Sequence, residues 1–137
     1  MAKQNREDYL RVFYSLCEET DKHCIRSVDV ATYLKISKAA VSKMLKKLTD
    51  KGLIKMEKYS NIYFTERGFV EAEKLTYKHR VIEVFLAEIL KINKKNIHEE
   101  AHKMEHSFSD EVIKKLAKYL NNPQYSPQGK KIPKFKK

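Results

Sequence analysis

The sequence predicts a mainly α-helical protein with one small β-hairpin, and three observations lead to this fold class. Apolar residues recur at helical spacing through most of the chain. Only three glycines and three prolines interrupt its 137 residues, so long helices can form. Near the middle, LIKMEKYSNIYFT (53–65) has two short runs rich in Ile, Tyr and Phe around a polar turn, which is typical of a hairpin.

Three helices are predicted before the hairpin. The first covers residues 5–20, where apolar side chains follow the period of an amphipathic helix. Ser27 stands where an N-cap belongs, ahead of a two-turn helix over 28–34. Ser37 is placed to cap a further helix that runs over 38–50. The polar segment between the first two helices is expected to be a loop.

Three more helices are predicted after the hairpin, over about 66–90, 93–106 and 109–122. Thr65 is a suitable N-cap for the first of them, and the last starts at Ser109 with Asp110 and Glu111 in its first turn, which suits the helix dipole. The remaining residues, 123–137, form a tail that contains proline and lysine and has no periodicity.

Two short helices, a tight turn and a hairpin make the pattern of a winged helix-turn-helix. One face of the second helix is apolar, and its other face carries Ser42, Lys43, Lys46 and Lys47. Eight lysines against two acidic residues lie between Lys35 and Lys58, which suits a surface that binds phosphates. The residues expected to contact DNA are Ser37, Lys38, Ala39, Ser42, Lys43, Lys46, Lys47 and Lys58. The alternative is that the lysines only form a solvated face.

Net charge agrees with a partner made of phosphates. The formal charge is +11, which fits either nucleic acid or an anionic membrane. No apolar run is long enough to span a bilayer, and the amino terminus MAKQNRED has no apolar signal core. We therefore expect a cytoplasmic protein that binds DNA, with no membrane and no small organic substrate as partner.

Histidines and carboxylates gather in the second half of the chain. At about 100° per residue, His98, His102, Glu105 and His106 share an arc of about 100° on the helix predicted over 93–106. His79 and Glu83 are spaced i, i+4 on the preceding helix, so they also share a face. Imidazole with carboxylate suits Fe(II), Mn(II), Co(II), Ni(II) or Zn(II). The alternatives are histidines with a structural role only, and a small metalloenzyme, although no nucleophile or cofactor motif accompanies the cluster.

Five motifs in order resemble the family of metal-dependent regulators related to the diphtheria toxin repressor and the manganese regulator MntR. These motifs are EDYLR (7–11), SVDVATYLKISKAAVSKMLKKLTDKGLI (27–54), FTERG (64–68), KHRVIEVFL (78–86) and HEEAHKMEHSFSDEV (98–112). The resemblance implies a homodimeric, metal-activated transcriptional repressor of metal-homeostasis genes, and not an enzyme. It implies a winged-helix domain (1–64), a helical metal-binding and dimerisation domain (65–122) and a basic tail (123–137).

The resemblance also implies two metal sites. The primary site would consist of Asp8, His102, Glu105 and His106, and the ancillary site of His79, Glu83 and His98. Asp8 enters through the resemblance alone.

Departures from the family pattern affect two expectations: which metal is bound and how many domains the protein has. Iron-type members have methionine and cysteine where this chain has Asp8 and His102, and manganese-type members have glutamate in place of Arg11 and of His102. A guanidinium at Arg11 disfavours a close binuclear manganese cluster, which places iron ahead of manganese. SPQGKKIPKFKK (126–137) resembles the segment that leads into an SH3-like domain in longer members, so a two-domain protein without that domain is expected.

Overall fold

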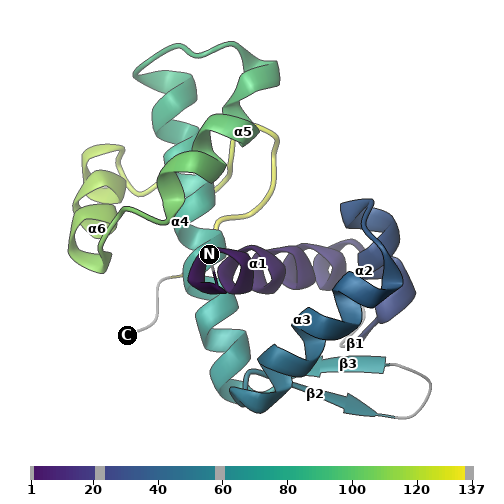
Figure 1. The fold of residues 1–137 in the computed structure, drawn as a ribbon. Coiled ribbons are helices and arrows are strands. Elements are labelled where there is room, and N and C mark those ends of the chain that lie inside the picture. The colour runs from purple at the N-terminus through teal and green to yellow at the C-terminus, as the bar shows by residue number, and fades with distance from the viewer. Residues whose placement is uncertain (1, 21–23, 58–60, 135–137) are drawn as a thin grey trace. The chain divides into compact units, whose positions relative to one another are not determined.

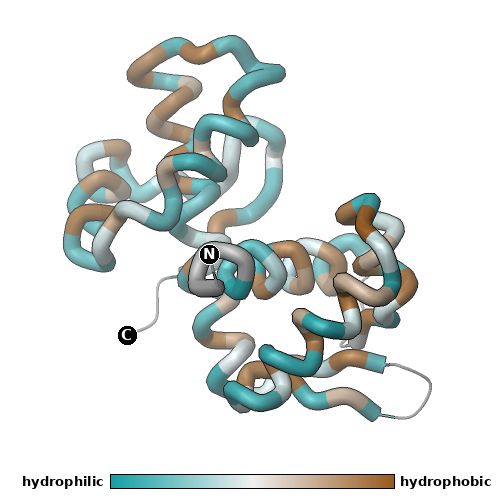
Figure 2. The backbone as a smooth tube through the Cα atoms, viewed as in Figure 1, coloured by the Kyte–Doolittle hydropathy of each residue, from teal (hydrophilic) through white to brown (hydrophobic). Residues whose placement is uncertain are grey.

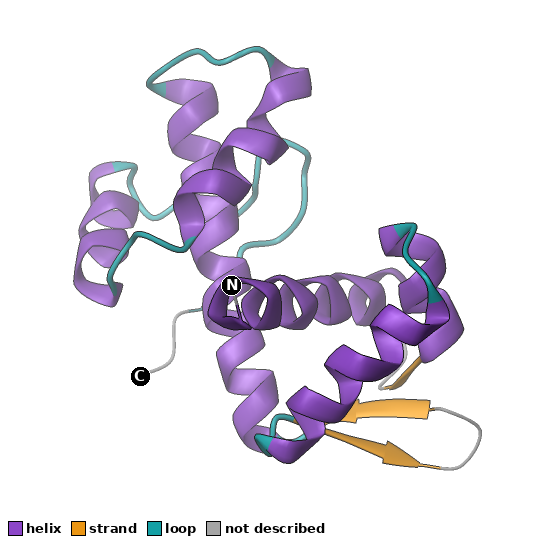
Figure 3. Cartoon of the chain, viewed as in Figure 1, coloured by secondary structure: helices purple, strands orange, loops and turns teal. Residues whose placement is uncertain are grey.

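The computed structural model describes residues 2–20, 24–57 and 61–134, and divides the chain into two compact units, residues 1–72 and 73–137. The described part of the protein is mainly helical with one small antiparallel sheet (Figure 3), as the sequence predicts.

The N-terminal unit combines three helices with a three-stranded sheet (Figure 1). Its elements are α1 (Ala2–Thr20), β1 (Cys24–Arg26), α2 (Ser27–Leu34), α3 (Lys38–Asp50), β2 (Ile54–Glu57) and β3 (Asn61–Phe64). The strand order is β1-β3-β2, with both pairs antiparallel. The predicted hairpin is therefore confirmed as β2 and β3, while the turn residues 58–60 lie outside the described residues. The helix-turn-helix is formed by α2 and α3.

Strand β1 was not predicted from the sequence, which indicated a polar loop there. Its three residues are too few for a periodic pattern, and they form a strand because they pair with β3 of the hairpin. Ile25 lies opposite Ile62 in this pairing, and both side chains are buried. Burial of these two apolar side chains supports the strand where local sequence does not.

The two serine caps predicted in the helix-turn-helix have different outcomes. Ser37 is confirmed, because its Oγ accepts a hydrogen bond of 3.1 Å from the backbone N–H of Ala40. Ser27 as a cap is wrong, because it is already the first residue of α2 and the extended N-cap is Arg26. Pairing with β3 holds Arg26 in extended conformation, so the helix can begin only at the next residue.

The core of the N-terminal unit is built by the predicted apolar face of α3 together with α1 and the sheet. Val41, Leu45 and Leu48 are buried on α3, and Leu10 and Phe13 are buried on α1. Figure 2 shows the alternation of apolar and polar positions along these helices. The lysine-bearing side of α3 is left for solvent.

Helix α4 (Glu66–Glu88) starts in the N-terminal unit and continues into the C-terminal one. Thr65 caps it as predicted, because its Oγ1 accepts a hydrogen bond of 3.0 Å from the N–H of Gly68. The same hydroxyl donates to the carbonyl of Gly52 at 2.7 Å. None of the described helices is long and apolar enough to cross a membrane.

The C-terminal unit packs α5 (Lys94–Glu105) and α6 (Asp110–Tyr119) with the second part of α4 around one apolar core. Ser109, predicted as the start of the last helix, is the N-cap of α6 and accepts a hydrogen bond of 3.2 Å from the N–H of Val112. The core includes a residue from the predicted tail, Ile132, and the next residue, Pro133, is buried as well. Arg80 donates a hydrogen bond of 2.6 Å to the carbonyl of Lys131, so part of the tail is fixed against α4.

An ion-pair cluster joins the start of α6 to α4 and gives a prediction on pH. Asp110 lies 3.0 Å from Lys74 Nζ and 3.4 Å from Lys78 Nζ. The hydrogen bond from Lys74 is the main cause that lowers the pKa of Asp110. A lowered pKa means that the ionised group stabilises the fold above its unfolded pKa, and that this stability is lost as the pH falls through the folded value. We expect Asp110→Asn to cost less than about 1 kcal/mol at pH 7 and nothing in strong acid, measured by urea unfolding at both pH values.

The matched control for this prediction is Glu111→Gln, which removes a neighbouring first-turn charge that faces Lys115 instead. If both variants lost the same stability, the helix dipole would account for the effect and the two lysines of α4 would not.

Candidate metal centre and nucleic-acid interface

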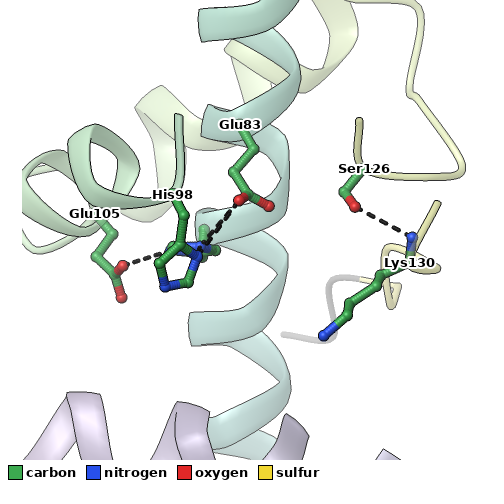
Figure 4. A network of polar contacts seen from close by, with 6 residues as sticks. Glu83, His98, Glu105, Ser126 and Lys130 are labelled. Carbon is green, nitrogen blue, oxygen red and sulfur yellow. Dashed lines mark hydrogen bonds and ion pairs between the residues drawn. The ribbon is translucent and has the colours of Figure 1, made fainter. Parts of the chain in front are cut away.

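Three predicted ancillary ligands come together in the C-terminal unit, and we call them the His79 triad: His79, Glu83 and His98. His79 and Glu83 are one turn apart on α4 and both are buried, while His98 comes from α5 with 57% of its side chain exposed. His79 Nε2 lies 3.1 Å from His98 Nδ1 and 3.4 Å from Glu83 Oε2. The third side of the triangle, from His98 Nδ1 to Glu83 Oε2, is 3.6 Å (Figure 4).

These distances fit ligation of one cation by all three side chains. Donors at about 2.1 Å from a transition metal are about 3.0 Å apart in an octahedron and about 3.4 Å apart in a tetrahedron. The three atoms thus form one face of either polyhedron without large movement. His98 is the exposed member of the triad, so its imidazole is the ligand that an ion from solvent can reach first.

The electrostatics of Glu83 favour a cation at the same point. Burial alone would raise the pKa of this carboxyl, but the imidazoles of His79 and His98 outweigh it and lower the pKa to about 2. Glu83 is therefore an anion at neutral pH. Its buried Oε2 faces His79 Nε2 at 3.4 Å and His98 Nδ1 at 3.6 Å, close enough for charge attraction, but it makes no hydrogen bond of good geometry among the described residues. An unsatisfied buried carboxylate oxygen is costly, and a bound cation would remove that cost.

Three of the predicted primary ligands lie on α5 or directly after it, and the fourth lies on α1. His102 and His106 are neighbours on one face at the end of α5, half-buried, with ring centroids 5.8 Å apart. Glu105 is buried, and its Oε1 lies 2.7 Å from Nδ1 of His79. Asp8 is half-buried on α1 of the N-terminal unit. The structure therefore brings Glu105 to the His79 triad, a contact that the sequence analysis did not predict.

A signal for this contact is present in the helical spacing. Glu105 follows His98 by seven residues, so both project from nearly the same side of α5, two turns apart. Both lie on the predicted arc of the helix over 93–106, and the resemblance of the motifs implies different sites for them. Only the packing of α5 against α4 decides which residue faces His79.

The predicted DNA-contact residues of α3 lie on its solvent side. Seven of them are exposed: Ser37, Lys38, Ala39, Ser42, Lys43, Lys46 and Lys47. Lys58, the eighth, lies outside the described residues. A weak exposed ion pair of 3.7 Å joins Lys46 to Asp50. The helix thus presents lysines and small side chains beside its own start, an arrangement that suits phosphate contacts and close approach to base edges.

Comparison with protein families matches both halves of the chain. Residues 1–62 match the iron dependent repressor, N-terminal DNA binding domain, and residues 65–134 match the iron dependent repressor, metal binding and dimerisation domain. An uncharacterized HTH-type transcriptional regulator of Methanocaldococcus jannaschii is 38% identical over 117 residues, which cover 85% of this chain and 93% of that protein.

Two characterised types of regulator are also similar. The iron-dependent repressor IdeR of Mycobacterium tuberculosis is 34% identical over 93% of this chain, which spans 54% of that protein's length. The regulator MntR of Oceanobacillus iheyensis is 31% identical over 88% of this chain and 80% of its own length. Among solved structures, the manganese regulator SloR has a TM-score of 0.83 at 39% identity and ScaR with bound Zn²⁺ a TM-score of 0.78 at 35%. The alignments cover 96% and 95% of this chain and 60% of each of those chains.

Both family matches and these relatives agree with the resemblance found in the motifs. The chain belongs to the iron-dependent repressor family of metal-dependent, DNA-binding transcriptional regulators.

Proposed function

We propose that this protein is a cytoplasmic repressor that binds operator DNA as a homodimer when a divalent transition metal is bound. The genes that it controls serve metal homeostasis. The observation that carries the proposal is the His79 triad, in which a buried carboxylate oxygen faces two imidazole nitrogens and has no hydrogen-bond partner in the part of the chain that the structure describes. The exposed lysines of α3 supply the DNA-binding surface, with Lys58 as a further contact. We also propose the boundaries 1–64, 65–122 and 123–137 for the DNA-binding domain, the metal-binding domain and the tail.

The ligands that we propose fall into two sites. His79, Glu83 and His98 hold one ion, and their geometry supports this assignment. For the primary site we propose Asp8, His102, Glu105 and His106. This assignment is supported by the resemblance of the motifs. Iron is our first choice and manganese the second, because Arg11 disfavours a binuclear manganese cluster. Relatives of both kinds exist, since IdeR is named for iron and SloR for manganese.

In the mechanism that we propose, the ion acts through the conformations of the dimer. A ligand shifts an equilibrium only by the difference in its affinity for the two states. Ligands from the N-terminal helix and from the helical domain, bound to one ion, would favour the form in which two α3 helices match two operator half-sites about one helical turn apart. The residues of the chain supply the ligands and the DNA contacts, and the ion supplies the linkage.

The decisive experiment measures DNA affinity with and without metal. Genomic fragments that the full-length protein retains in Mn(II) are labelled, and binding is followed by fluorescence anisotropy in chelator and in Fe(II), Mn(II) or Zn(II). We expect metal to tighten binding by roughly 10- to 100-fold, the usual range for coupling between two sites. Equal affinity in chelator and in all three metals would overturn the metal switch and favour a regulator that is not controlled by metal.

Lys43→Ala is the control for the DNA-contact surface. It removes one exposed cation of α3, so it should weaken binding in every metal condition alike and reduce the salt dependence by about one unit of slope.

A further inference from the structure

Glu105 is the most deeply buried carboxylate around the His79 triad. Its side chain is 0% exposed, and its Oε1 lies 2.7 Å from His79 Nδ1, a short hydrogen bond between buried groups. When Glu105 is a carboxylate it can only accept, so the His79 tautomer that fits this contact has its hydrogen on Nδ1 and donates it. Figure 4 shows Glu105 approaching from the side of His98 that is away from Glu83.

The consequence concerns the other ring nitrogen of His79. A neutral imidazole with its hydrogen on Nδ1 has a lone pair on Nε2. Nε2 is the atom that lies 3.1 Å from His98 Nδ1 and 3.4 Å from Glu83 Oε2, at the centre of the triad. Glu105 thereby selects the tautomer of His79 that can ligate a cation there, and it fixes the plane of the ring.

We propose that Glu105 is the positioning carboxylate of the His79 triad, so that ion binding there depends on Glu105 even when the predicted primary site is absent. The proposal deepens the function proposed above and rests on it. The proposal gives Glu105 a second role: besides being a predicted ligand of the primary site, it orients a ligand of the ancillary site. Carboxylates that accept from the second nitrogen of a ligating histidine typically contribute 10- to 100-fold to metal affinity.

The test separates this role from ligation in the primary site. His102→Ala with His106→Ala removes two predicted primary ligands and leaves the contacts of His79 in place. In this background chain, Zn(II) affinity is measured by competition with a chromophoric chelator, and each chain should bind one ion. Adding Glu105→Gln, which keeps the size of the side chain, should weaken Zn(II) binding by roughly 10-fold or more. Glu99→Ala, an exposed carboxylate of the same helix, should leave the affinity unchanged.

A second readout reports the tautomer directly. In the metal-free background chain, ring nitrogen shifts of His79 by NMR should show hydrogen on Nδ1 alone. In Glu105→Gln a mixture of tautomers is expected, because an amide can donate to Nδ1 as well as accept from it. Unchanged Zn(II) affinity or an unchanged single tautomer in Glu105→Gln would overturn the proposal. A third outcome would separate the two proposals. If His79 showed the Nδ1 tautomer and lost it in Glu105→Gln, but the background chain bound no ion, Glu105 would still orient His79. The proposed metal binding by the triad would then be wrong.

Discussion

Replacing Glu83 by glutamine is expected to remove the stabilisation that a divalent cation gives to the His79 triad. Glutamine keeps the shape of the side chain but takes away the only anionic donor among the three ligands. A cation at 100 times its dissociation constant stabilises the folded chain by about 2.7 kcal/mol, and we expect most of this gain to be lost. The measurement is thermal unfolding in chelator and in excess Zn(II) or Mn(II), on the chain that carries His102→Ala and His106→Ala so that only the triad is tested.

Glu88→Gln is the matched control for this prediction. Glu88 lies on the same helix, α4, and is exposed, so the change removes the same charge without touching the triad. The cation should stabilise this variant as it stabilises the parent chain. An equal gain from the cation in Glu83→Gln would show that the ion binds elsewhere on the protein.

The parts of the fold that depend on local signals are those that the sequence predicts. Ser37 and Thr65 both cap helices as predicted, and a hydroxyl that accepts from a nearby backbone N–H needs no distant partner. The hairpin of β2 and β3 is local in the same sense, because its two runs adjoin one turn. Strand β1 and the packing of Ile132 depend on partners far away in the sequence, which periodicity does not reveal.

In the candidate metal centre, too, local contacts could be predicted from the sequence and distant ones could not. His79 and Glu83 share a face because of their spacing on one helix, and this pair could be predicted from sequence. Glu105 could be placed on the correct face of α5 but not against His79, since that contact depends on the register between two helices. The role of Asp8 came from the resemblance of motifs and remains a prediction, because no spacing within one helix connects it with the histidines.

Gly68→Ala is expected to destabilise the N-terminal unit strongly. A Cβ at this position would meet the carbonyl oxygen of Leu53 at 1.8 Å, which is far inside van der Waals contact. That oxygen also accepts a hydrogen bond of 3.1 Å from the N–H of Thr65, and Leu53 itself donates to Leu48 at 3.1 Å. The backbone around Leu53 is thus fixed on both sides and cannot move away cheaply. We expect a loss of roughly 3 kcal/mol in urea unfolding.

Whether Gly68→Ala stabilises or destabilises the protein tests the close contact with Leu53. Alanine in a helix is favoured over glycine by about 1 kcal/mol, so without the close approach the substitution would stabilise α4. Gly52→Ala is the control, because Gly52 has a φ of +73° but nothing within 4 Å of an added Cβ, and it should cost only about 1 kcal/mol of strain. A Gly68→Ala protein as stable as its parent would contradict the close contact. Leu53 directly follows the turn that ends α3. A shift of the Leu53 backbone in Gly68→Ala should therefore also move the lysine-bearing helix and weaken DNA binding.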